Sequence, residues 1–174
     1  MLFKETSLKD LILIEPEYIL DERGFFSRII CQDEFRDHGL ENNWLQQNIS
    51  FNKVKGTLRG MHLQKGNAAE IKIVRCTQGA VFDVAVDMRP HSDTYLQWYG
   101  VELTSLNHRQ LYIPKGFAHG FLTLCDNCEL TYLMSQKYMP NFSCGFRYDD
   151  PKLKIDWPEK VNCISEKDKR WSFL

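Results

Sequence analysis

Short stretches in which apolar and polar side chains alternate run through most of this chain. Because successive side chains of a β-strand point to opposite faces, a period of two predicts strands that are buried on one face. In residues 80–87, for example, Phe82, Val84 and Val86 share one face, while Asp83 and Asp87 lie on the other. The predicted strands cover residues 11–14, 25–29, 48–52, 58–64, 71–76, 80–87, 96–103, 110–113, 120–124 and 129–134.

The segments between these strands are short. Residues 21–24 and 77–79 predict tight turns, the second of them a hairpin turn that joins strands 71–76 and 80–87. One helix is predicted over residues 32–38, with acidic residues in its first turn and Gly39 at its end. Many short strands without a βαβ alternation predict an all-β fold, an antiparallel sandwich or barrel of the jelly-roll type with one or two short helices. We expect the tail, residues 149–174, to be irregular or partly helical and to pack over the barrel.

Composition narrows the class of protein. A chain of 174 residues with 43% hydrophobic residues predicts a single domain, residues 1–174. A net charge of -1 without a long basic run argues against nucleic-acid and membrane-surface proteins. The N-terminal residues hold no uncharged apolar run of signal-peptide or membrane-span length, so a cytoplasmic location is expected. The six cysteines are expected to be free thiols, and the single pair Cys125 and Cys128, in a predicted hairpin turn, does not suffice for a zinc or redox site.

The most informative stretch is LRGMHLQ, residues 58–64, which is followed by Lys72 on the next predicted strand. Strand alternation places His62 and Gly60 on one face and Arg59 on the other. A lone histidine on a strand is commonly a hydrogen-bonded core residue, but small and polar neighbours suit a cavity. An unpaired buried lysine is costly, so Lys72 is expected to line a polar space or to reach water. His62 and Lys72 together indicate a candidate proton-transfer site.

Two further residues allow alternative interpretations. In YIPKGFAHGF, residues 112–121, a turn directs His119 inward, as in the second motif of metal-binding cupins. A metal site would then use His62, Glu70 and His119, but the H-x-H spacing of a first cupin motif is missing and Glu70 comes late. Tyr132 lies among apolar neighbours, which favours a core anchor over a proton donor facing a pocket.

Several motifs, in the same order along the chain, resemble one known family. They are DERGFF (21–26), QNIS (47–50), LRGMHLQ (58–64), KIVRC (72–76), VFDVAVDMR (81–89), RQLYIPKGFAHGF (109–121), IDWP (155–158) and SEKD (165–168). Through them the chain resembles the dTDP-4-dehydrorhamnose 3,5-epimerase family over nearly its whole length. The resemblance implies a cupin-type jelly roll that forms a homodimer, needs no metal or other cofactor, and acts on a nucleoside diphosphate 4-keto-6-deoxy sugar.

The resemblance also implies roles for individual residues. His62 would be the general base, oriented by Asp168 from the tail, while Lys72 would stabilise the enolate and Tyr132 would return the proton to the opposite face. The residues expected around the diphosphate, sugar and base are Arg23, Phe26, Gln47, Asn48, Arg59, His119, Tyr138 and Lys167. These roles agree with the chemistry, since a proton next to a ketone is removed readily only if the enolate charge is stabilised as it forms.

Two departures from the family pattern leave the substrate open. Gln47 stands where many members have an acidic residue, and the loop 51–57 is about one residue longer. The sugar could therefore be linked to dTDP, CDP or GDP, and inversion could occur at C3, C5 or both. Two other classes remain as alternatives, a metal-dependent cupin oxygenase and a jelly roll that binds sugars without catalysis.

Overall fold

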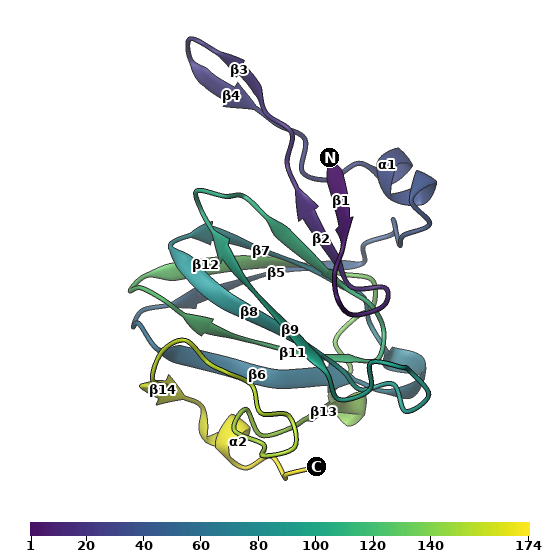
Figure 1. Cartoon of the computed structure of the whole chain (residues 1–174), viewed down its shortest axis with the longest axis vertical. Coiled ribbons are helices and arrows are strands. Elements are labelled where there is room, and N and C mark those ends of the chain that lie inside the picture. The colour runs from purple at the N-terminus through teal and green to yellow at the C-terminus, as the bar shows by residue number, and fades with distance from the viewer.

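Two β-sheets face each other and form a sandwich in the computed structural model, which describes all residues, 1–174 (Figure 1). Sheet I contains, in spatial order, β1 (Leu2–Glu5), β2 (Ile12–Glu15), β10 (Gln110–Ile113), β7 (Lys72–Gln78), β12 (Cys128–Met134) and β5 (Gln46–Asn52). Sheet II contains β13 (Ser143–Gly145), β6 (Thr57–Gln64), β11 (Phe117–Thr123), β8 (Ala80–Asp87) and β9 (Trp98–Thr104), and β14 (Cys163–Ile164) pairs with β6 in parallel. The predicted all-β fold is confirmed.

The short elements agree in part with the prediction. Helix α1 (Gln32–Asp37) lies where a helix was expected, and Gly39 follows it with a φ of 69°. The tail contains a second short helix, α2 (Glu166–Lys169), and 3-10 turns lie at Gly66–Ala68 and Pro140–Phe142. Each predicted strand has a counterpart, whereas β1, β13, β14 and the strand Ile19–Asp21 (β3) were not predicted. No helix is long and apolar enough to cross a membrane.

The strands from β5 to β8 alternate between the two sheets, so one predicted connection is wrong. β7 pairs with β10 and β12 in sheet I, whereas β8 pairs with β9 and β11 in sheet II. The turn at residues 77–79 is therefore a corner between sheets and not a hairpin. Gly79 has a φ of 78°, a conformation that glycine adopts without a steric penalty. The turn from Cys125 to Cys128 likewise leads from β11 in sheet II to β12 in sheet I.

The alternation predicted for residues 80–87 is confirmed. Val81 and Ala85 belong to the largest core cluster, which lies between the sheets. Val84 and Val86 belong to a second cluster on the outer face of sheet II, which the tail covers with the buried Leu153 and other apolar side chains. The tail thus packs over the barrel as expected, and it brings α2 to β6.

A two-stranded hairpin, β3 (Ile19–Asp21) and β4 (Gly24–Phe26), projects away from the sandwich (Figure 1). Its apolar side chains are exposed: Ile19 is 68% accessible, Leu20 77% and Phe26 68%. Three large exposed apolar side chains on one projecting hairpin are typical of a surface that is covered by another chain. We call this segment, residues 19–26, the arm.

Candidate active site

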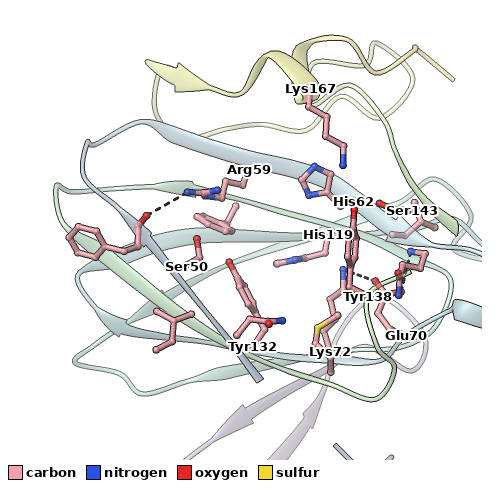
Figure 2. A pocket seen from close by; sticks show the side chains of 17 residues that line it. Ser50, Arg59, His62, Glu70, Lys72, His119, Tyr132, Tyr138, Ser143 and Lys167 are labelled. Carbon is pink, nitrogen blue, oxygen red and sulfur yellow. Dashed lines mark hydrogen bonds and ion pairs between the residues drawn. The ribbon is translucent and has the colours of Figure 1, made fainter. Parts of the chain in front are cut away.

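A cavity of about 480 Å³ opens between the two sheets and collects most of the predicted site residues (Figure 2). His62 and His119 enter it from β6 and β11 of sheet II, and Lys72 and Tyr132 enter from β7 and β12 of sheet I. Asn48, Arg59, Tyr138 and Lys167 also line it. The barrel therefore places a histidine and a tyrosine on opposite walls of one polar space.

His62 and Asp168 form a short polar contact beside the cavity. His62 Nε2 lies 2.6 Å from Asp168 Oδ1, and the Gly60 N–H donates to Asp168 Oδ2 at 3.4 Å. Burial on its own would raise the pKa of Asp168, but the hydrogen bond and charge of His62 and the Gly60 N–H hold that pKa below its ordinary value. An ionised carboxylate on one ring nitrogen fixes the tautomer of the imidazole and favours the cation that forms when the ring takes up a proton.

Lys72 is not unpaired, because Glu70 accompanies it. Lys72 Nζ lies 2.9 Å from Glu70 Oε1, and both side chains are almost fully buried. The second oxygen of Glu70 accepts the backbone N–H of Gln64 at 3.1 Å. The sequence suggested Glu70 only as a poorly spaced metal ligand. Residues two apart on a strand share a face, so Glu70 could have been predicted as the ion-pair partner of Lys72.

Tyr132 packs against the largest core cluster and also lines the cavity, so both predicted alternatives hold in part. Burial raises the pKa of Tyr132 to about 12, with the charge of Asp83 acting in the same direction and a hydrogen bond with the Ser50 side chain opposing it. The phenol therefore stays protonated at neutral pH and can donate a proton. Its partner Ser50, on β5, was missed by sequence reasoning.

His119 is held by a carboxylate of its own. Its Nε2 lies 2.8 Å from Oδ1 of Asp83, a fully buried residue on β8 whose other oxygen has no protein partner. The ring centres of His119 and Tyr132 lie 6.4 Å apart in an edge-to-face arrangement. Asp168, Lys72 and Asp83 thus engage the three ligands that a metal-dependent oxygenase would need, which are His62, Glu70 and His119. No three His, Cys, Asp or Glu side chains form a cluster suited to a metal ion.

Arg59 lies on the same cavity as His62, which corrects the prediction that the two face opposite ways. The register of β6 against β11 shifts between His119 and Phe121, opposite this part of β6, so simple alternation does not hold there. Gly60, with a φ of 146°, permits the irregularity, and a Cβ on it would lie 2.6 Å from the Cα of Gly120. Arg59 Nε donates to the buried side chain of Asn52 at 2.7 Å, which directs the guanidinium along the cavity wall.

Gln47 does not reach the cavity. It lies exposed on the outer face of sheet I, where it borders a separate depression with Arg75 and Thr131. Its neighbour Gln46 shares a face with Asn48, donates to the side-chain oxygen of Asn48 at 2.8 Å, and accepts the Tyr138 N–H at 3.2 Å. Strand alternation from Asn48 would have selected Gln46.

Arg23 and Phe26 also lie outside the cavity of their own chain. Both are exposed on the arm, and the Arg23 guanidinium pairs with Asp21. The two remaining predicted residues do line the cavity: Tyr138 is 55% accessible, and Lys167 extends from the tail toward His62 (Figure 2).

Comparison with known proteins decides the family. The sequence profile described as dTDP-4-dehydrorhamnose 3,5-epimerase matches residues 5–174. The chain belongs to this family. It is 46% identical to the dTDP-4-dehydrorhamnose 3,5-epimerase of Methanothermobacter thermautotrophicus, over 99% of this chain and 94% of that protein.

Solved structures of family members agree with the fold. The dTDP-4-dehydrorhamnose 3,5-epimerase of Elizabethkingia anophelis superposes with a TM-score of 0.97 at 39% identity, covering 100% of this chain and 96% of that one. RmlC of Legionella pneumophila, in complex with dTDP-4-keto-L-rhamnose, gives a TM-score of 0.91 at 40% identity, covering 98% and 91%. The predicted cupin-type fold and the predicted class of enzyme, a carbohydrate epimerase, are confirmed.

Proposed function

We propose that this chain inverts C3 and C5 of dTDP-4-dehydro-6-deoxy-D-glucose to give dTDP-4-dehydro-L-rhamnose. The observation that carries the proposal is the entry of His62 and Tyr132 into one cavity from opposite sheets, with Lys72 beside Tyr132 on sheet I. Membership of the epimerase family and the dTDP-4-keto-L-rhamnose bound by the Legionella relative support the choice of substrate.

Each inversion needs a base on one face of the sugar and an acid on the other. His62 takes the proton from the carbon next to the C4 ketone, and the electron pair of the C–H bond moves into the enolate. Asp168 stabilises the imidazolium through the 2.6 Å contact. Tyr132 then delivers a proton to the opposite face. The tyrosinate regains a proton from solvent, and the His62 imidazolium releases its proton to solvent. Repetition at the second carbon completes the reaction.

The enolate oxygen requires a positive charge in a water-poor space. Lys72 supplies it, since the attraction between unlike charges is larger in a cavity than in bulk water. Glu70 holds the ammonium at 2.9 Å and therefore fixes its position before the substrate arrives. This arrangement is preorganised, so little reorganisation is needed when the charge develops.

Binding of the nucleotide is proposed for residues at the opening of the cavity. Arg59 and Lys167 are the cations available to the diphosphate, and arginine can bind phosphate oxygens through two parallel hydrogen bonds. Asn48, His119 and Tyr138 lie where they can contact the sugar or base. We replace Gln47 by Gln46 in this set, because Gln46, unlike Gln47, shares the inward face of β5 with Asn48.

The arm explains how Arg23 and Phe26 can serve a site that they do not reach in their own chain. We propose that the protein is a homodimer in which each arm inserts its exposed apolar side chains against the partner and brings Arg23 to the partner's cavity. Burial of Ile19, Leu20 and Phe26, which are 68%, 77% and 68% accessible, would stabilise such a dimer.

Two broader proposals accompany this one. The whole chain acts as one domain, because the tail supplies Asp168 to His62 of the barrel. The location is cytoplasmic, which agrees with six cysteines that are all free.

Deuterium exchange tests the proposed function. The protein is incubated in D2O with dTDP-4-dehydro-6-deoxy-D-glucose and, in parallel, with the CDP- and GDP-linked 4-keto sugars, and the products are followed by NMR. We expect deuterium at both C3 and C5 of the dTDP-linked product. Label at one carbon only would restrict the reaction to that carbon, and the absence of label with every substrate would reject the proposal.

A further inference from the structure

Trp171 lies in the tail, three residues after Asp168, and its indole contacts two residues of the proposed site. Its Nε1 donates to Asp168 Oδ1 at 3.3 Å, and this is the same oxygen that lies 2.6 Å from His62 Nε2. The Lys167 ammonium lies over the indole ring, 5.6 Å from the ring centre. One side chain therefore contacts both the carboxylate partner of the base and a cation at the cavity mouth.

The space that holds the indole is created by a glycine. Gly145 of β13 is the register partner of His62 on β6. A Cβ at residue 145 would lie 2.4 Å from Trp171 Cε2 and 2.5 Å from Trp171 Nε1, distances at which the ring would have to move. The ring centres of His62 and Trp171 are 6.4 Å apart, so the indole occupies this space directly beside the base.

The tail needs such a contact. Helix α2 has only four residues, and so short a helix is not stable without tertiary contacts. Within the tail, Asp168 is held by its N–H, which donates to the side chain of Ser165 at 3.0 Å, and by the indole of Trp171. Without the indole, the carboxylate loses the hydrogen bond that Trp171 donates to the oxygen shared with His62.

We propose that Trp171 is a positioning residue that acts through both of these neighbours. The indole N–H holds Asp168 Oδ1 in place for His62 and shares the negative charge of that oxygen, while the ring face holds Lys167 at the mouth of the cavity. The kinetic consequences rest on the proposed function, whereas the contacts themselves can be measured without turnover.

The indole N–H also affects the protonation of His62, because both groups contact Asp168 Oδ1. A second donor on Asp168 Oδ1 weakens the stabilisation that this oxygen gives to protonated His62. Removal of the indole N–H should therefore let His62 protonate at a higher pH. The other titratable or charged groups that share cavities with His62 are Arg59, Glu70, Lys72, His119, Tyr132, Tyr138, Cys163 and Lys167, and all of them are the same in the wild type and in the variants below.

Two variants separate the two contacts. Trp171→Phe keeps an aromatic face for Lys167 and removes the N–H, so the midpoint of the acidic limb of kcat/KM should rise by roughly 0.3 to 0.5 pH unit with little change in KM. Trp171→Ala removes both contacts, so KM for the nucleotide sugar should also rise roughly two- to fivefold. Trp157→Phe is the matched control, since the Trp157 indole donates to the Tyr148 carbonyl at 3.0 Å in the tail but away from the site.

NMR titration of the His62 ring in the wild type, Trp171→Phe and Trp157→Phe proteins gives a readout that does not depend on catalysis. We expect an upward shift of the midpoint in Trp171→Phe alone. An unchanged or lowered midpoint in Trp171→Phe, or the same shift in Trp157→Phe, would overturn the inference even if the enzyme is an epimerase. A wild type that exchanges no deuterium with any nucleotide sugar would instead reject the proposed function and leave the titration result standing. If Trp171→Ala does not fold, the Phe variant alone decides.

Discussion

His62 and Asp168 are separated by 106 residues in the sequence and by 2.6 Å in space. The contact forms because β14 adds to the edge of the sandwich in parallel with β6 and delivers α2 beside the histidine strand. The side chain of asparagine has nearly the same shape as that of Asp168 but carries no charge. This allows the role of its charge to be tested separately from its size.

We expect Asp168→Asn to lower kcat by roughly 100-fold or more, because the amide no longer stabilises the imidazolium and can favour the wrong tautomer. KM should change little, since Asp168 lies behind His62. Steady-state kinetics with circular dichroism as a check of folding measure this. A variant with nearly wild-type kcat would show that His62 does not depend on the carboxylate.

Glu70 and Lys72 should show strong coupling in stability, because either charge alone is left buried. Glu70→Gln is expected to destabilise the protein by about 2 kcal/mol, and Lys72→Met in addition should restore part of that loss. Urea unfolding of the wild type, both single variants and the double variant gives the coupling energy. Additive effects of the two substitutions would contradict an ion pair that matters for stability.

The arm can be tested by mixing two inactive variants. Arg23→Ala and His62→Ala are each expected to be inactive as homodimers. In a mixed dimer, an arm with Arg23 reaches the cavity that contains His62, so refolding the two together in equal amounts should restore roughly a quarter of wild-type activity. If each arm served its own chain, the mixture would stay inactive. Size-exclusion chromatography of Phe26→Ser, which should weaken the dimer, provides the structural control.

The sequence predicted the fold well where burial decides which side chains of a strand alternate. It predicted less where the result depends on which distant strands pair. Alternation in residues 80–87 correctly separated Val84 and Val86 from Asp83, because each face of β8 meets a different environment. The same pattern cannot show which sheet a strand joins, so the corner at Gly79 was predicted as a hairpin.

The site was predictable in its chemistry and less so in its geometry. His62, Lys72, Tyr132 and His119 do meet in one cavity. Arg59 was placed on the wrong face, because a register shift in the partner strand is invisible in the sequence of β6. Arg23 and Phe26 are predicted to lie in the pocket, but they are exposed on the arm and do not line the cavity of their own chain.

The central claim is that His62 and Tyr132 act on opposite faces of the sugar, and Tyr132→Phe in D2O tests it most directly. The variant keeps the base and the enolate stabiliser, so the recovered substrate should gain deuterium without inversion, while formation of the inverted product falls by roughly 100-fold or more. His62→Ala, in contrast, should lose both exchange and inversion. Equal loss of exchange and inversion in Tyr132→Phe would contradict a relay with one residue on each face.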